Sequence, residues 1–110
     1  MTKILPGIRN VSNGTTDIVA IDESFELDPG EALSGTPTVT EVDTSDLTIS
    51  QKTLNSTELT INGNAVAENC AVLFKISGQK AGTLYHIKYT VSTTNVSGRS
   101  LSWIVRLQCR

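Results

Sequence analysis

The sequence predicts an all-β domain, an antiparallel β-sandwich of about seven to eight short strands. Apolar and polar residues alternate along most of the chain, which is the pattern of a sheet with one buried face and one wet face. Turn-forming Asp, Asn, Gly and Ser residues interrupt the alternation at roughly ten-residue spacing, and no window has helical periodicity. The length of 110 residues corresponds to one domain.

The first sixteen residues differ from the rest of the chain. They contain Pro6, Gly7 and Gly14 and show little periodicity. They therefore predict an extended N-terminal arm over residues 1–16, outside a sandwich domain over residues 17–110. Ile4 and Ile8 flank Pro6, so two interpretations stay open: an arm that docks on a neighbouring subunit through these side chains, or a frayed terminus.

Short strands are expected from residue 17 onward. Residues 17–21 and 24–27 are apolar stretches separated by an acidic turn, Asp22-Glu23, and form either one bent strand or two short ones. Asp28-Pro29-Gly30 ends this region with strong turn chemistry. Alternation predicts three further strands, over residues 38–42, 47–50 and 59–61.

The C-terminal part of the chain predicts three longer strands with regular alternation. Their inward positions are expected to form the core: Cys70, Val72, Phe74, Ile76, Tyr85, Ile87, Tyr89, Val91, Leu101, Trp103, Val105 and Leu107. The polar stretch over residues 93–98 ends in Gly98 and predicts a hairpin loop. The last two strands should therefore pair antiparallel.

Tyr85 lies just inside the penultimate strand, after a segment that contains Gly78 and Gly82. This placement resembles the tyrosine corner of immunoglobulin-like sandwiches, in which the phenol hydroxyl bonds back to the crossover backbone. A plain core tyrosine is the alternative. With the corner, the predicted fold class is an all-β, immunoglobulin-like antiparallel β-sandwich with an extended N-terminal arm.

The charges are sorted along the chain. All eleven acidic residues lie between Asp17 and Glu68, whereas the residues after Glu68 carry six basic residues and no acidic one. Opposite-sign faces steer and register an association, so this sorting favours a protein that packs against copies of itself or against a charged neighbour. Surface charge that is merely scattered in space is the alternative.

Alternation places Lys88, Ile104 and Arg106 on one wet face of the last two strands, where two cations around an aliphatic side chain form a candidate contact patch. Its acidic counterpart is expected between residues 22 and 46. The candidate interface residues on that side are Asp22, Glu23 and Glu26, together with Ile4 and Ile8 of the arm.

No catalytic, cofactor or metal site is expected. His86 is the only histidine and has no carboxylate near it in sequence, which makes it a poor general base and a poor metal ligand. The acidic residues from Asp22 to Glu31 lack the spacing of a calcium loop, so a solvated edge is favoured over a calcium site. Cys70 and Cys109 are expected to be free thiols, with a disulfide as the alternative.

The composition also bears on partners. A net charge of −2 argues against nucleic acid as the main partner. No apolar stretch reaches the roughly 18 residues of a membrane span, and the N-terminal apolar run is too short for a signal peptide. A protein that neither enters a membrane nor binds nucleic acid, and that is made in a cytosol, is expected.

The C-terminal run over residues 78–108 resembles the end of small bacteriophage tail proteins known as fiber-tail adaptors. In that family a Gly-containing turn leads to a Tyr-containing strand, then to a polar hairpin with Gly and Arg, and then to a final alternating strand. The residues in comparable places here are Gly82, Tyr85, Ile87, Val91, Gly98, Arg99, Leu101, Ile104 and Val105. Phe25 and the stretch over residues 33–39 resemble the family's first two strands more loosely.

This resemblance implies a non-enzymatic virion structural protein, assembled in the host cytoplasm, that acts as a tail or neck adaptor between a tail or portal-proximal ring and the fibers. The implied partners are other virion structural proteins, namely tail, connector or fiber subunits, and further copies of the chain in a homo-oligomer. A capsid decoration (cement) protein is the first alternative. A carbohydrate- or surface-binding module is the second, and it would need an outward-facing Trp103, Tyr85 or Tyr89.

Overall fold

The computed structural model describes residues 3–5, 7–94 and 99–110. The strands of these ranges are β1 (Lys3–Ile4), β2 (Arg9–Val11), β3 (Asp17–Asp22), β4 (Leu33–Val42), β5 (Thr48–Leu54), β6 (Leu59–Ile61), β7 (Asn64–Val66), β8 (Ala71–Ser77), β9 (Leu84–Thr93) and β10 (Ser100–Cys109). A short 3₁₀ turn, η1 (Ser24–Glu26), follows β3.

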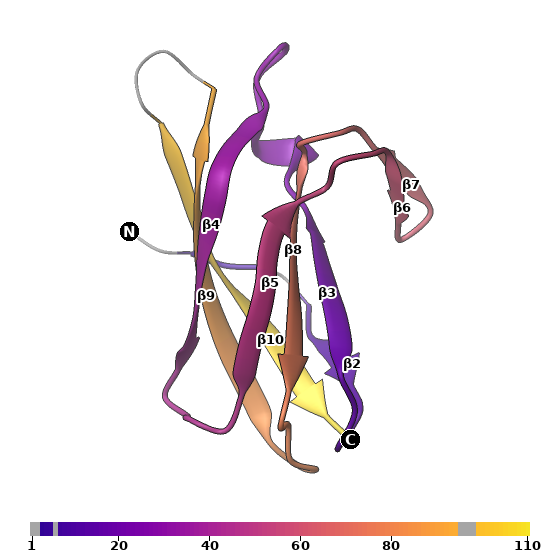
Figure 1. Ribbon diagram of the computed structural model, residues 1–110, viewed down its shortest axis with the longest axis vertical. Coiled ribbons are helices and arrows are strands. Elements are labelled where there is room, and N and C mark those ends of the chain that lie inside the picture. Colours follow the sequence, from indigo (N-terminus) through magenta and orange to yellow (C-terminus); the bar gives the residue numbers. More distant parts are fainter. Residues whose placement is uncertain (1–2, 6, 95–98) are drawn as a thin grey trace.

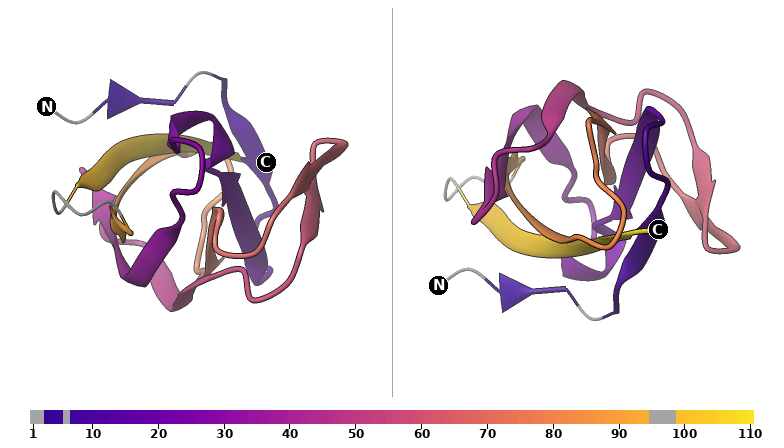
Figure 2. Two further views of the ribbon diagram at one scale, coloured as in Figure 1. Left: turned by 90° about the horizontal axis from the view of Figure 1, so that it is seen from above. Right: turned by 90° about the horizontal axis from the view of Figure 1, so that it is seen from below.

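Two main sheets pack together, which confirms the prediction of an all-β, sandwich-like fold (Figure 1). The first sheet has the order β1-β10-β9-β4, and β2 also pairs with β10. The second sheet has the order β3-β8-β5. The hairpin of β6 and β7 stands to one side of the sandwich, as both views of Figure 2 show.

The space between the sheets holds the predicted core. Trp103 is only partly buried and packs against this core. Cys70 is also partly buried, but it packs against a separate small cluster of Ile61, Val66 and Ala71. The other predicted core positions are buried: Val72, Phe74, Ile76, Tyr85, Ile87, Tyr89, Val91, Leu101, Val105 and Leu107. The alternation of side chains along β8, β9 and β10 accounts for this result, because a strand presents every second side chain to the opposite sheet.

The predicted antiparallel pairing of the last two strands is confirmed. Trp103 lies opposite Tyr89, and the register continues without interruption from Ser100 to Gln108. The predicted loop over residues 93–98 lies mostly outside the described residues, since positions 95–98 are not described.

The predicted backbone contact of Tyr85 is also present. Its buried hydroxyl accepts a hydrogen bond from the backbone amide of Lys80 at 2.9 Å and donates to Asp46 Oδ2 at 3.1 Å. The phenol thus ties the segment before β9 to the segment between β4 and β5, with both hydroxyl functions satisfied.

The prediction of a strand over residues 24–27 is wrong. Asp22 Oδ1 accepts a hydrogen bond from the Ser24 backbone amide at 2.8 Å, and Glu26 donates its backbone amide to the Glu23 carbonyl at 3.0 Å. This Asx-type turn bends the chain as soon as β3 ends and leads into η1. The apolar side chains of residues 25 and 27 therefore do not alternate along a strand.

The expectation of an arm outside the core is also corrected for the described part of residues 1–16. Both β1 and β2 pair in parallel with β10, and Leu5 donates its backbone amide to the Ile104 carbonyl at 2.8 Å. Leu5 and Val11 are buried in the main core. The N-terminal strands extend the chain's own first sheet, because their apolar residues bury more surface there than a free arm would.

Of the hairpin of β6 and β7, only the first strand was predicted, over residues 59–61. Asn62 and Gly63 have φ values of 52° and 80°, which are the left-handed conformations of a two-residue type I′ turn. Asn55 anchors this hairpin. Its side-chain amide donates to the carbonyls of Thr57 and Ala67, and its Oδ1 accepts the backbone amides of Cys70 and Ala71.

Candidate functional site

The outer face of the first sheet brings several predicted interface residues together. The register aligns Ile4 with Ile104, and Ile104 with Lys88. Lys88 is exposed and Ile104 is half-buried. Arg106 lies one step along the same face and donates from Nη2 to the Gly7 carbonyl at 3.2 Å, so it also holds the N-terminal segment in place. The structure thus gathers these cations and aliphatic side chains on one sheet face.

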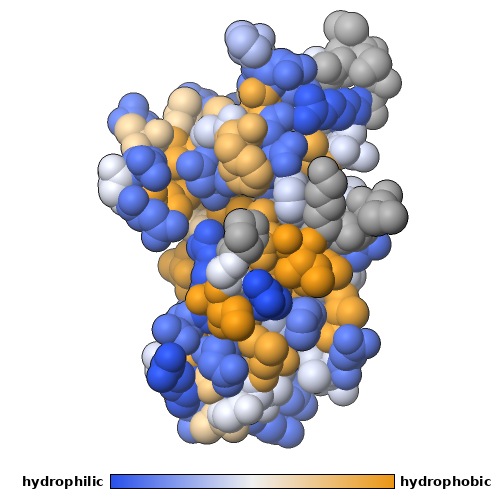
Figure 3. Space-filling model, turned by 180° about the vertical axis from the view of Figure 1, so that it is seen from behind, coloured by the Kyte–Doolittle hydropathy of each residue, from blue (hydrophilic) through white to orange (hydrophobic). Residues whose placement is uncertain are grey.

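The N-terminal segment and η1 add exposed apolar surface. Ile4 is 53% exposed, Ile8 50% and Phe25 63%. Figure 3 shows apolar side chains gathered at mid-height on the back of the molecule, the side along which Figure 2 places the N-terminal strands. We call Ile4, Ile8 and Phe25 the apolar rim. Monomeric surfaces carry single exposed aliphatics routinely, but apolar side chains gathered on one side, as in Figure 3, indicate a contact surface.

The predicted acidic residues do not form one exposed edge. Glu23 is fully buried, so its place on a solvated interface is wrong. Its backbone amide donates to the Cys70 carbonyl at 2.9 Å, and its Oε1 accepts the hydroxyl proton of Tyr89. The chain turns inward at this residue because the backbone of Glu23 is held by the loop before β8. Asp22 is half-buried.

Glu26 belongs to an ion-pair cluster within the chain. Arg99 donates from Nη2 to the Glu26 carbonyl at 2.6 Å and from Nη1 to Glu31 Oε1 at 3.1 Å. Asp28 Oδ2 lies 3.4 Å from the same Nη1. Glu31 also accepts the hydroxyl proton of Thr93 at 2.6 Å. One basic residue, Arg99, therefore lies within 4 Å of three carboxylates of the acidic segment, although it is far from them in sequence.

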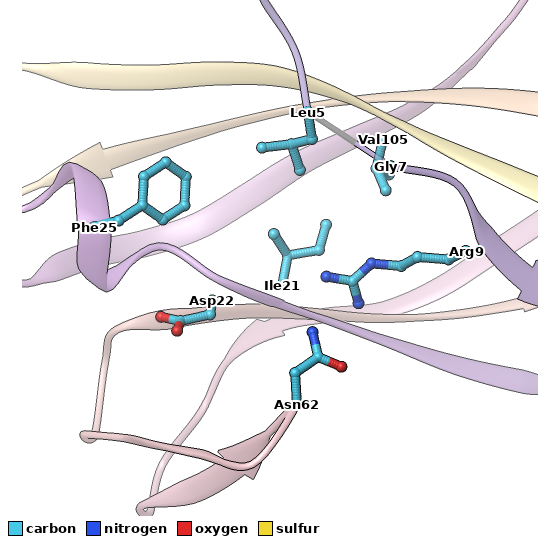
Figure 4. Close-up of a pocket in the computed structure, with 8 residues that line it drawn as sticks. All are labelled: Leu5, Gly7, Arg9, Ile21, Asp22, Phe25, Asn62 and Val105. Carbon is cyan, nitrogen blue, oxygen red and sulfur yellow. The ribbon is translucent and has the colours of Figure 1, made fainter.

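A pocket of about 300 Å³ opens between the N-terminal segment and β3. We call it the N-terminal pocket. Its walls are Leu5, Gly7, Arg9, Ile21, Asp22, Phe25, Asn62 and Val105. Figure 4 shows the Arg9 guanidinium and the Asn62 amide at one end and the Phe25 ring at the other. The aliphatic side chains lie between these ends, and the Asp22 carboxylate points away from Arg9.

Burial changes the protonation equilibria around this pocket. Burial raises the pKa of Glu23 to about 7, the hydrogen bond from Tyr89 partly opposes that rise, and the nearby charges of Glu26 and Asp22 add to it. Burial also raises the pKa of Tyr89 and lowers that of Arg9. Glu23 Oε2 is buried and has no hydrogen-bond partner among the described residues.

The remaining polar candidates carry no site. His86 lies opposite Arg106 and Val42 on the outer face of the first sheet. Cys70 and Cys109 are free thiols, as predicted. In the part of the chain that the structure describes, no three His, Cys, Asp or Glu side chains are grouped so that they could hold a metal ion.

Trp103 does not form an open aromatic platform. Its side chain is partly buried against the core, and its ring meets the Phe25 ring edge-on, with centroids 5.9 Å apart and an interplanar angle of 61°. Tyr85 and Tyr89 are fully buried. None of the three is presented in the way that stacking on a sugar requires.

The sequence did not indicate that Arg9 and Asn62 would line one pocket, or that Tyr89 would bond to Glu23. Arg9 lies in a three-residue strand whose alternation is too short to detect, and its register places it beside the inward-facing Leu107. Asn62 carried a usable signal, since Asn62-Gly63 is a hairpin-turn dipeptide. No local signal indicated that Tyr89 would meet an acidic side chain.

Comparisons of the chain with protein-family models, with curated proteins and with solved structures find no match. Among the described residues, no helix is long and apolar enough to pass through a bilayer.

Proposed function

We propose that this protein is a non-enzymatic structural component of a bacteriophage virion, a tail or neck adaptor that connects a tail or portal-proximal ring to fibers through subunit contacts. The observation that carries the proposal is the gathered contact surface on the first sheet and the N-terminal segment. There, Ile4 lies beside Ile104, Ile104 lies beside Lys88, and Ile8 is half exposed. Exposed aliphatic side chains gathered on one face of a soluble domain indicate a protein–protein contact.

The immunoglobulin-like class of the sandwich is part of this proposal. The hydrogen bond from the Lys80 amide to the Tyr85 hydroxyl supports it, because a phenol that bonds to the backbone just upstream is a feature of that class. The resemblance of the C-terminal strands to fiber-tail adaptors supports the virion role.

The structure changes how the contact would work. Two of the acidic residues expected to face a neighbour's cations are engaged within the chain. Glu23 is buried, and the Glu26 carboxylate lies 3.9 Å from Arg99 Nη2. We therefore assign the contact mainly to apolar burial, with Lys88 as a positioning charge.

The test is to locate the protein in particles of the phage or prophage that encodes it. Mass spectrometry of purified particles should find the protein, and gold-labelled antibody should mark the neck or tail. Label over the capsid surface would instead indicate a decoration protein, and absence from the particles would overturn the virion role.

Substitution tests the contact surface itself. Ile8→Asp should abolish incorporation into particles, because a carboxylate in an apolar contact loses hydration without gaining a partner. Ile18→Asp is the matched control. Ile18 is 66% exposed on β3 of the second sheet, so the same chemical change falls on the other side of the sandwich. Equal incorporation of the two variants would contradict the assigned surface.

A further inference from the structure

Arg9 is a charged side chain at an inward-facing position. Strand β2 pairs with the end of β10 so that Arg9 lies beside Leu107, whose side chain is fully buried. The guanidinium therefore projects toward the space between the sheets and forms part of the wall of the N-terminal pocket (Figure 4). It donates from Nη1 to the Ala20 carbonyl, which links β2 to the edge of β3.

The charge of Arg9 is not balanced by any carboxylate in the described ranges. Arg9 makes no ion pair with any residue in the described ranges. Of the two nearby acidic residues, Asp22 is turned away and accepts the Ser24 amide, and Glu23 is hydrogen-bonded to Tyr89. A half-buried guanidinium has lost part of its hydration, and a carboxylate from outside would replace it with a strong charge-assisted hydrogen bond.

The rest of the pocket is suited to the apolar part of the same ligand. Leu5, Ile21 and Val105 line its middle, and Phe25 closes the end opposite Arg9. The volume of about 300 Å³ accommodates one or two side chains. Asn62 stands beside Arg9 and offers an amide donor, so the carboxylate end of a ligand is directed to these two residues and away from Asp22.

From these contacts we propose that the N-terminal pocket binds a carboxylate side chain flanked by apolar residues, presented by an extended segment of a partner protein. Two residues of the apolar rim favour a protein segment over a small organic acid, since Ile4 and Ile8 do not line the pocket and are each about half exposed. The inference rests on the proposed function only in naming a partner protein. It adds the chemistry of the segment that the partner supplies.

The test uses the full chain and a set of acetylated, amidated pentapeptides that place one Glu between residues drawn from Val, Leu and Phe. Each peptide is paired with its Gln counterpart, and binding is followed by amide chemical shifts at neutral pH and low salt. The best Glu peptide should bind at least about tenfold tighter than its Gln counterpart, with shifts at Leu5, Ile21 and Asn62.

Variants tie the preference to one side chain. Arg9→Gln should remove the preference for Glu over Gln. Arg110→Gln should keep it, because Arg110 is exposed at the end of the same sheet and contacts Asn10 outside the pocket. If Arg9→Gln fails to fold, the Glu-to-Gln comparison on the unsubstituted chain decides alone. No preference for Glu, or a preference that survives Arg9→Gln, overturns the proposal.

The source of the carboxylate is tested with 3-phenylpropionate as a free acid. The best peptide should bind at least about tenfold tighter than this acid. Equal affinity would overturn the assignment to a partner segment and reassign the pocket to small organic acids. None of these outcomes depends on where the protein lies in a particle, so the failure of this inference is distinguishable from failure of the virion role.

Discussion

Tyr89 and Glu23, which are 66 residues apart in sequence, form a buried hydrogen bond between the two sheets. The phenol hydroxyl donates and Glu23 Oε1 accepts. Both side chains are fully buried, and Glu23 Oε2 has no partner among the described residues. The sandwich therefore contains a titratable group whose charged form is disfavoured by its surroundings.

This pair predicts a dependence of stability on pH. The pKa of Glu23 is raised in the folded protein to about 7 from 4.5, so its contribution to stability is fully present below about pH 4.5 and is lost as the pH rises through about 7. The loss is on the order of 3 kcal/mol in the free energy of unfolding. Urea titrations between about pH 4 and pH 8 measure it.

Glu23→Gln isolates the pH-dependent contribution of Glu23 to stability, because the glutamine side chain is neutral at every pH between about 4 and 8. The free energy of unfolding of the variant, relative to the parent, should rise by on the order of 3 kcal/mol from about pH 4 to pH 8. Glu58→Gln, at an exposed glutamate, serves as the control and should show no comparable change. A pH-independent difference at Glu23 would refute the raised pKa.

Gly78→Ala should destabilise the protein by about 2–4 kcal/mol. Gly78 has a φ of +86°, and an added Cβ would lie 2.7 Å from the Asp46 carbonyl oxygen, which belongs to the backbone. Gly82→Ala is the matched control, since Gly82 has a φ of +81° with nothing within 4 Å of its Cβ position. Thermal unfolding should show a loss of only about 1 kcal/mol for the control. Equal losses would mean that the close approach to Asp46 adds no cost.

Arg99→Gln should lower the free energy of unfolding by about 2–3 kcal/mol, because the Glu31 carboxylate, only 4% exposed, loses its cation. Lys80→Gln provides the comparison. Lys80 pairs with Asp46 at 3.4 Å but is 71% exposed, so its removal should change stability by no more than about 0.5 kcal/mol. Chemical denaturation of both variants measures the contrast, and similar effects would count against a structural role for the Arg99 cluster.

Asn55→Ala should cost about 2–3 kcal/mol, because two backbone carbonyls and two backbone amides each lose a hydrogen bond, and the Ala71 amide loses it in a buried setting. Hydrogen exchange should accelerate in β6 and β7, which this side chain anchors. Asn64→Ala, at an exposed position of the same hairpin, should change stability by less than about 0.5 kcal/mol. Unchanged exchange in Asn55→Ala would show that the hairpin is held by other contacts.

The strands of the C-terminal half were predictable because their information is local. Alternation along β8, β9 and β10 determines which side chains face inward, and a polar loop between β9 and β10 determines that they pair antiparallel. The same local chemistry placed Tyr85 where its hydroxyl meets the Lys80 amide.

The contact surface was predictable only in part. Lys88, Ile104 and Arg106 share a face because alternation and pairing follow from sequence. The contacts of Ile104 with Ile4 and of Arg106 with Gly7 depend on the N-terminal strands that pair in parallel with β10. These strands are only two and three residues long, which is too short for an alternation to show in the sequence.

By itself, the sequence determined the all-β class and the inward faces of the long strands, and it favoured free cysteines over a disulfide. Only the tertiary structure decided where the charges meet: Glu23 inside against Tyr89, Glu26 on Arg99, and Arg9 beside a pocket. The physical reason is the distance along the chain over which each feature is set. Side-chain alternation is set by the backbone of a few neighbouring residues, whereas a charge finds its partner wherever the folded chain returns, and linear order does not encode that distance.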